Sequence, residues 1–394
     1  MPLRKINNKK KKNGLLPYSV RVNFTDVNGE HQSVERTVYG YDEAVLKEQE
    51  LIAEYKNTKI APSSRITVKN LIEEYEKVHS QDTKKGSHDT TMRILKQRVE
   101  PILGEKRLDK LTKKDLEDWK TEINKQKLLK GENKGEEGIS LRTKRNAYKT
   151  LMSLLNFAVD MGYISQNPLK TVKNFKDVNR GYIKKEMQVY TEEQFKDFIK
   201  VAENHCQTIQ DWNYYVFFCI LFFMGLRKGE CYGLTWGDIE GDIMHIRRSV
   251  SQKVKDEDGN DYVDTPKTYN SIRDILIPEL LVTILNDHKK RQQDATRELF
   301  SEDFKVCGHG YRAIRDSTVD SRNQQFAEEA HLPHIRIHDF RHSHATFLIN
   351  NGVNFIAVSR RLGHANITET LNTYSHLYKT TEQEALAILN GLKI

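Results

Sequence analysis

Apolar and polar residues alternate near the start of the chain and then change to a helical spacing. Residues 18–39 alternate around an Asn-Gly turn, and this pattern predicts a β-hairpin. A helix is expected over residues 41–57, and the Pro-Ser-Ser segment at 62–64 marks a linker. The pattern therefore predicts a first domain, residues 1–62, made of a small sheet and one helix.

The middle of the chain places apolar residues on one face of each of four helical stretches. These stretches begin at Thr67 and then cover residues 89–100, 113–127 and 140–161. The segment 130–138 is rich in Lys, Glu and Gly and is expected to be an exposed loop. Four helices with short links predict a compact helical domain over residues 63–170.

The last part of the chain, residues 186–394, begins with helices and changes to strands. Thr191-Glu-Glu-Gln194 is a capping box that opens the first helix, and the apolar run 214–226 predicts a buried helix. Strands are then expected, and helices return from His338 onward. The predicted strands are 243–250, 262–265 and 274–277. The fold class is therefore multidomain and mainly α, with β structure at the N-terminus and inside the last domain.

Composition favours a polyanionic partner. The chain has 394 residues, 63 Lys and Arg against 55 Asp and Glu, a formal charge of +8 and a pI near 9.0. Charge alone does not distinguish a surface that binds a polyanion from an ordinary solvated basic surface. The same two interpretations apply to the lysine run at 9–12. Four separated cysteines suggest neither a zinc cluster nor disulfides and fit a reducing cytoplasm. We expect no signal peptide and no membrane span.

Four short segments of the last domain carry polar groups suited to phosphoryl transfer. They are Gly225–Glu230, Thr265–Thr268, His338–His342, and Leu362–His364 followed by Tyr374. In this order and at these spacings, over about residues 190–380, they resemble the tyrosine recombinases, specifically the lambda-type integrases of phages and transposons. The resemblance implies a mixed α/β catalytic domain and metal-free, ATP-free strand cleavage, so no cofactor is expected.

The resemblance also implies a role for each of six residues. The six are the phosphate-binding Arg227 and Arg341, the β-hairpin Lys267, the active-site histidines His338 and His364, and the nucleophile Tyr374. A planar guanidinium can hold two nonbridging phosphate oxygens at once. A tyrosine hydroxyl with an ordinary pKa near 10 needs a proton acceptor, for which we expect His338. Lys267 is expected to protonate the leaving 5′ oxygen and His364 to hydrogen-bond the phosphate.

Several alternatives remain open within the last domain. Lys253 and Lys255 compete with Lys267, and Tyr378 lies one helical turn beyond Tyr374. Glu230 is expected to orient Arg227 through a buried ion pair. The remaining nearby histidines are expected to be structural: His342, His344 and His376.

The first two domains resemble the DNA-binding domains of integrases. The N-terminal domain resembles the arm-binding domain, whose three-stranded sheet can enter a major groove, and its expected base contacts are Arg21, Asn23 and Arg36. The helical domain resembles the SAM-like core-binding domain. Its expected phosphate contacts are Lys84, Lys85, Arg93, Lys96, Lys144, Arg145 and Lys149. An ordinary solvated surface accounts equally well for about half of these seven.

We therefore predict a site-specific integrase that integrates and excises a mobile element through a 3′-phosphotyrosyl intermediate. The resemblance implies double-stranded attachment sites, a homotetramer on DNA, an excisionase and a DNA-bending host factor. A last helix over residues 381–392 is expected to dock on a neighbouring subunit or on its own domain. A DNA-binding regulator without chemistry is disfavoured by the complete set of six residues, and a type IB topoisomerase by the arm-like domain.

Overall fold

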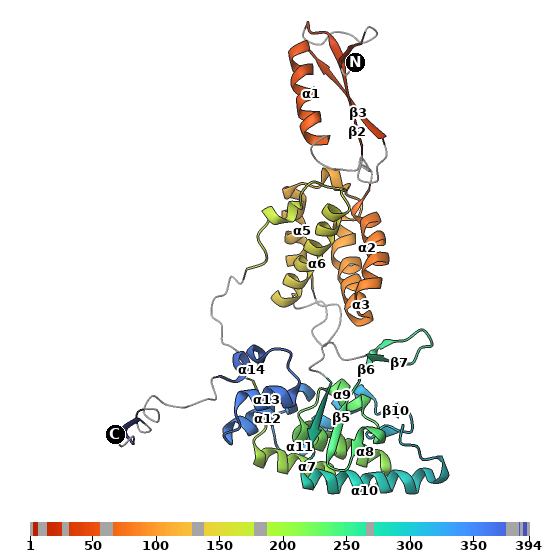
Figure 1. Ribbon diagram of the computed structural model, residues 1–394, viewed down its shortest axis with the longest axis vertical. Coiled ribbons are helices and arrows are strands. Elements are labelled where there is room, and N and C mark those ends of the chain that lie inside the picture. The colour runs from red at the N-terminus through yellow and green to blue at the C-terminus, as the bar shows by residue number, and fades with distance from the viewer. Residues whose placement is uncertain are drawn as a thin grey trace. The chain divides into compact units, whose positions relative to one another are not determined.

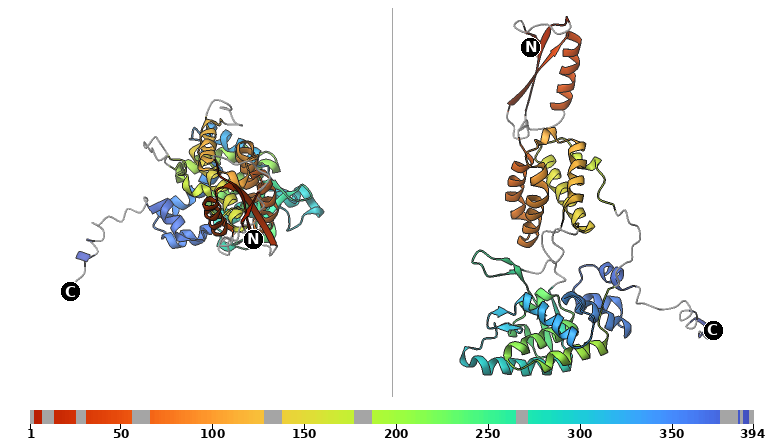
Figure 2. Two further views of the ribbon diagram at one scale, coloured as in Figure 1. Left: turned by 90° about the horizontal axis from the view of Figure 1, so that it is seen from above. Right: turned by 180° about the vertical axis from the view of Figure 1, so that it is seen from behind.

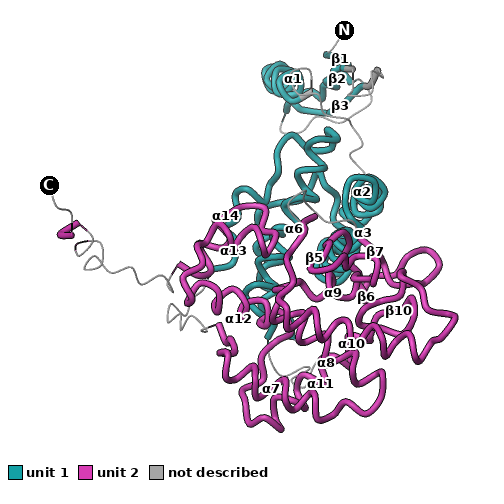
Figure 3. The backbone as a smooth tube through the Cα atoms, turned by 60° about the horizontal axis from the view of Figure 1, so that its bottom comes forward, with its two compact units in different colours: residues 1–182 teal, residues 183–394 magenta. Residues whose placement is uncertain are grey.

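The chain forms two compact units in a computed structural model, residues 1–182 and residues 183–394 (Figure 3). The structure describes residues 3–6, 14–25, 31–55, 66–127, 138–176, 187–264, 272–375, 386 and 389–391. The unit boundary falls between the helical and the last domain expected from the sequence, and the predicted three-domain boundaries stay a prediction.

The N-terminal part is an antiparallel sheet in the order β1-β2-β3 with one covering helix (Figures 1 and 2). The strands are β1 (Leu3–Lys5), β2 (Pro17–Thr25) and β3 (His31–Tyr39), and the helix is α1 (Tyr41–Tyr55). Val20 and Val22 of β2 are buried with Ala44 and Leu51 of α1. The predicted hairpin and helix are thereby confirmed, while the turn at Asn28-Gly29 lies outside the described residues.

The helical part has a core of its own, centred on the fully buried Trp119. Its helices are α2 (Val68–Asp82), α3 (Lys85–Ile94), α4 (Glu100–Leu103), α5 (Lys113–Lys125) and α6 (Leu141–Asp160), with a π-helical turn over Leu95–Val99. The side chains of Thr67, Thr112 and Ser140 cap α2, α5 and α6, which explains where these helices begin. The helix predicted over 89–100 is thus part of a longer helical run from 85 to 103.

The second unit packs helices around one central apolar helix, α8. Its helices are α7 (Glu192–Asn204), α8 (Ile209–Met224), α9 (Lys228–Gly233), α10 (Glu279–Thr296), α11 (Asp316–Glu329), α12 (Ile337–Asn350), α13 (Phe355–Leu362) and α14 (Ile367–Tyr374). Its strands are β4 (Ile239–Glu240), β5 (Ile243–Ile246), β6 (Ser249–Lys255), β7 (Asp261–Asp264), β8 (Arg273–Leu276), β9 (Gly308–His309) and β10 (Arg312–Ala313). They form three small sheets, β4-β5-β8, β6-β7 and β9-β10.

Helix α8 is buried around most of its circumference, as predicted for its apolar run. Phe217, Phe218 and Ile220 are fully buried, and helices α7, α10 and α12 pack against it. A helix enclosed by other helices can be apolar on every side. Among the described residues, neither α8 nor another helix combines the length and apolarity that a membrane crossing requires.

Two predictions for this unit are wrong. Helices return at α10 and α11, well before His338, and the strand predicted over 243–250 is divided between β5 and β6, which belong to different sheets. Helix α11 has few apolar residues, and two of its four buried residues, Asn323 and Ala327, are polar or small. The apolar spacing that would predict a helix is therefore weak in this segment. The start of α10 is rich in Leu, Ile and Val, which a strand would tolerate equally well.

Candidate active site

Arg227 is positioned by a sharp turn at the end of α8. Gly225 ends that helix in the left-handed conformation with φ of 63°, and the chain then enters α9 at Arg227. Glu230 accepts hydrogen bonds from both the backbone N–H and Nη1 of Arg227, each at 2.9 Å. Nη2 donates to the carbonyl oxygen of Gly363 at 3.3 Å. The ion pair expected between Arg227 and Glu230 is therefore present, with the carboxylate buried and the Arg227 side chain 36% exposed.

Arg341 of α12 connects the two turns that carry the other site residues. Its side chain is 2% exposed, and its Nη1 and Nη2 donate to the carbonyl oxygens of Gly225 and Leu362, each at 2.8 Å. Burial, reinforced by the charge of Arg227, lowers the pKa of Arg341 to about 9. A guanidinium has five N–H donors, so three remain beyond these two bonds.

A third arginine, Arg273, joins this cluster and was not anticipated from the sequence. It begins β8, and its Nη2 donates to Oε2 of Glu230 at 2.9 Å. Its Nε donates to the carbonyl oxygen of Arg361 at 2.8 Å. Arg273 thereby links the strand that follows residues 265–271 to both Glu230 and the end of α13.

The arginine cluster carries more positive charge than its carboxylate neutralises. Burial alone would raise the pKa of Glu230, but the hydrogen bonds and charge of Arg273, with the charges of Arg227 and Arg341, lower that pKa to about 2. Glu230 is therefore ionised at neutral pH, and among the described residues its carboxylate is shared by Arg227 and Arg273, with the charge of Arg341 nearby. Buried charges of one sign are costly unless an opposite charge compensates them. The cluster is thus suited to bind an anion such as a phosphodiester.

The two predicted histidines lie at the rims of this cluster. His364 follows the left-handed Gly363, and its Nδ1 lies 2.7 Å from Oγ1 of the buried Thr370. Burial and the charge of Arg341 lower the pKa of His364 to about 3. His338 keeps an exposed edge, and partial desolvation together with the charge of Arg341 lowers its pKa. Both rings are therefore neutral at pH 7.

Tyr374 ends α14 and is 1% exposed. Its Oη lies 2.6 Å from Nδ1 of His342, which makes His342, rather than His338, its hydrogen-bond partner among the described residues. This bond leaves the expected structural role of His342 untested, and it places the ring beside the predicted nucleophile. Its position four residues after His338, on the same face of α12, was the signal that could have identified it. His344 does bond within the core, to the carbonyl oxygen of Phe222.

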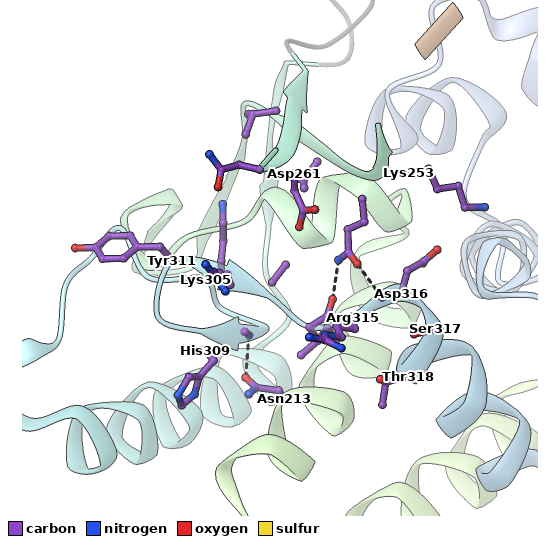
Figure 4. A pocket seen from close by; sticks show the side chains of 18 of the residues that line it. Asn213, Lys253, Asp261, Lys305, His309, Tyr311, Arg315, Asp316, Ser317 and Thr318 are labelled. Atoms are coloured by element: carbon purple, nitrogen blue, oxygen red, sulfur yellow. Dashed lines mark hydrogen bonds between the residues drawn. The ribbon is translucent and has the colours of Figure 1, made fainter. Parts of the chain in front are cut away.

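Lys267, Tyr378 and His376 lie outside the described residues. The competing lysines are on β6, where Lys255 pairs with Asp261 at 2.5 Å and Lys253 is exposed. Lys253 lines a pocket of about 1350 Å³ between the β6-β7 hairpin and the start of α11 (Figure 4). None of the five described catalytic candidates lines this pocket, so it is separate from the arginine cluster.

The seven basic residues predicted to contact phosphates in the helical domain differ in their exposure and in their hydrogen-bond partners. Arg93 and Lys149 are exposed, and Lys84, Lys85 and Lys144 are half-buried. Lys96 pairs with Glu76 at 2.9 Å, and Nε of Arg145 donates to the carbonyl oxygen of Phe175 at 3.1 Å.

The three predicted base contacts of the N-terminal sheet are divided between its two faces. Arg21 and Asn23 are exposed on β2, opposite Glu35 and Ser33, and the Arg21 side chain donates to the Ser33 hydroxyl at 3.1 Å. Arg36 is also exposed, but it pairs with the buried Val20 and therefore projects from the opposite face of the sheet, on which α1 packs. The structure therefore brings Arg21 and Asn23 together and separates Arg36 from them.

Known proteins are similar to this chain in sequence and in fold. Residues 188–381 match the phage integrase family, and residues 52–124 match the SAM-like N-terminal domain of phage integrases. The ICEBs1 integrase of Bacillus subtilis (strain 168) is 26% identical, over 98% of this chain and 99% of that protein. A XerC-like tyrosine recombinase of Caldanaerobacter subterraneus subsp. tengcongensis is 31% identical, over 66% of this chain and 68% of that protein. The Tn1549 transposon integrase in complex with transposon right-end DNA shares the fold, with a TM-score of 0.61 and 22% identity over 83% of this chain and 99% of the other.

Proposed function

The chain belongs to the phage integrase family of tyrosine recombinases, and from this premise we propose that Tyr374 is the nucleophile with which it cuts DNA. It is a site-specific recombinase that cuts and rejoins DNA strands and so integrates and excises a mobile element. The observation that best supports the role of Tyr374 is its hydroxyl next to the arginine cluster: burial raises the pKa of that hydroxyl, and the positive charge of Arg341 acts in the opposite direction and favours the phenolate. The catalytic assignments below are part of the same proposal.

Arg227 and Arg341 form a clamp that holds the scissile phosphate. Each retains N–H donors beyond those that bond to protein, and each is fixed by backbone or carboxylate contacts. Donors that are already oriented need no reorganisation when charge develops on the nonbridging oxygens. Glu230 keeps Arg227 in place, and we assign to the same phosphate His364, which directly follows the Gly363 whose carbonyl oxygen accepts a hydrogen bond from Arg227.

Cleavage forms a bond between the Tyr374 oxygen and phosphorus and breaks the bond from phosphorus to the 5′ oxygen. The proton of the Tyr374 hydroxyl passes to a neutral histidine of α12, for which His338 remains our candidate. The departing 5′ oxygen takes a proton from Lys267 and becomes a free hydroxyl. Attack by the 5′ hydroxyl of another strand on the phosphotyrosine reverses these steps and rejoins the DNA.

The protein binds double-stranded DNA, and we propose that it acts on two attachment sites as a homotetramer. Exchange of both strands at two sites requires four cleavages, and one active site per subunit then requires four subunits. The described residues near the C-terminus, Leu386 and Leu389, are 56% and 62% exposed and could pack on a neighbouring subunit. An excisionase and a DNA-bending factor are the partners we expect to direct excision.

We assign the three predicted domains to arm-type binding (1–62), core-type binding (63–170) and catalysis (186–394). Separate hydrophobic clusters support this division. Arg21 and Asn23 are the favoured base contacts of the arm domain because they share an exposed face. Arg93 and Lys149 are the favoured phosphate contacts of the core-binding domain because they are exposed.

Covalent trapping tests the proposal. Wild-type protein is incubated with a nicked duplex of the element's attachment site, because the nick lets the cleaved end diffuse away and traps the intermediate. We expect a protein–DNA adduct that survives denaturant in the wild type and in Tyr378→Phe, and no adduct in Tyr374→Phe. An adduct that persists in Tyr374→Phe would show that the nucleophile lies elsewhere.

The same assay separates the two alternatives. A regulator without chemistry forms no adduct in any variant. A type IB topoisomerase relaxes supercoiled plasmids without preference for the attachment site, whereas the proposed recombinase requires that site.

A further inference from the structure

The hydroxyl of Tyr374 has a partner that the reaction outlined above does not use. The ring belongs to a buried cluster with Val358 and Leu362, and its Oη reaches Nδ1 of His342 at 2.6 Å. Buried hydroxyls are normally hydrogen-bonded. Here, however, the partner is the immediate neighbour of Arg341, which the proposed mechanism places on the phosphate.

Protonation states fix the direction of this bond. Burial raises the pKa of Tyr374 above its ordinary value. Burial, with the charge of His338, lowers the pKa of His342 to about 4, although Asp339 acts in the opposite direction. At neutral pH both groups are uncharged, so the phenol donates and Nδ1 accepts, and the ring proton of His342 is on Nε2.

The bond places the hydroxyl at the reaction centre. Arg341 and His342 are adjacent on α12, and the rings of His338 and His342 meet edge to face at 4.9 Å. One arginine of the clamp, the candidate proton acceptor and the residue that holds the hydroxyl are therefore neighbours on α12. A hydroxyl that is already fixed has less orientational freedom to lose before it attacks.

We propose that His342 is a positioning residue that holds the Tyr374 hydroxyl beside the arginine clamp and affects strand cleavage only through that hydroxyl. The inference rests on the proposed role of Tyr374 as nucleophile. It differs from a purely structural role in a measurable way. A structural residue would influence the clamp whichever nucleophile attacks, whereas His342 matters only when the attacking group is Tyr374.

The first test compares His342→Leu with His342→Asn. Leucine removes the acceptor at similar volume, whereas the asparagine Oδ1 takes the place of Nδ1. We expect single-turnover cleavage of the nicked duplex to be about 10- to 100-fold slower in the Leu variant. The Asn variant should retain the wild-type rate to within roughly fivefold. A Leu variant as fast as or faster than wild type, or an Asn variant as slow as Leu, overturns the proposal. Urea unfolding of both variants checks that they fold.

The second test replaces the phenol with an external nucleophile. Tyr374→Phe is incubated with the duplex and hydrogen peroxide, whose oxygen attacks phosphorus in place of Tyr374 while the arginine clamp stays intact. Adding His342→Leu to this variant should leave the peroxide-driven rate unchanged. A further loss of rate would show that His342 acts on the phosphate or on the fold, which overturns the proposal.

Failure of the proposed function gives a different result. If Tyr374 is not the nucleophile, Tyr374→Phe still forms a denaturant-resistant adduct without peroxide. That adduct is measured before His342 is changed, so the two failures are distinguishable.

Discussion

Glu230 offers the sharpest test of how the site is held together, because one carboxylate serves two arginines. It is 5% exposed and accepts hydrogen bonds from Arg227 and Arg273. Glu230→Gln keeps the size of the side chain and removes the charge. The amide group also brings N–H donors toward guanidiniums that need acceptors, so we expect both the fold and the clamp to weaken.

The pKa of Glu230 gives the size of the expected loss in unfolding free energy. Lowering it from 4.5 to about 2 stabilises the ionised form by about 3 kcal/mol in the folded protein, at about 1.4 kcal/mol per pH unit. The folded-state pKa is depressed, so this stability is fully present above pH 4.5 and is lost as the pH falls toward 2. We therefore expect Glu230→Gln to be less stable than wild type by about 3 kcal/mol at pH 7 and by about half of that near pH 3.

Urea unfolding between pH 3 and pH 7 measures this difference, with Glu302→Gln as control. Glu302 pairs with Lys289 on the surface, where its side chain is 57% exposed, so its loss should cost no more than about 1 kcal/mol at any pH. Strand cleavage by Glu230→Gln should fall about 100-fold because Arg227 loses its orientation. Equal stability of Glu230→Gln and wild type at pH 7, or a difference that does not shrink in acid, would refute the reasoning.

The secondary structure could be predicted from the sequence wherever one spacing of apolar residues continued along a whole segment. The hairpin of β2 and β3 and the buried helix α8 follow from alternation and from a continuous apolar run. The break between β5 and β6 could not be predicted in this way, because Arg247 fits the alternation and a single polar residue at an inward position, Arg248, does not by itself end a strand. Arg248 pairs with Asp238 at 2.9 Å, a contact that fixes the break only once the chain is folded.

The candidate site was predictable where residues share a motif and not where contacts join distant segments. Arg227, Arg341 and Tyr374 stand in motifs of the family that the sequence resembles. Arg273 stands in no such motif, and it reaches Glu230 across 43 positions. His342 also stands inside a motif, but its contact with Tyr374 depends on the packing that brings α14 onto α12 and not on local sequence.

Two further substitutions test the turns and the clamp that hold this site. Arg341→Lys should reduce single-turnover cleavage by about 100-fold or more, because an ammonium has only three N–H donors and cannot bond to the carbonyl oxygens of Gly225 and Leu362 and also to two phosphate oxygens. The exposed Arg297→Lys serves as its control, and a rate near wild type for Arg341→Lys would exclude a bidentate role. Gly225→Ala should destabilise the protein by about 2–4 kcal/mol, because an added Cβ would lie 2.5 Å from Cδ2 of His344 in a left-handed turn. Gly352→Ala is the matched control: its φ of 83° carries a similar conformational cost of about 1 kcal/mol, but its Cβ would meet nothing within 4 Å. Equal losses of unfolding free energy in the two alanine variants would mean that backbone conformation, and not the packing of the Gly225 turn against α12, limits this position.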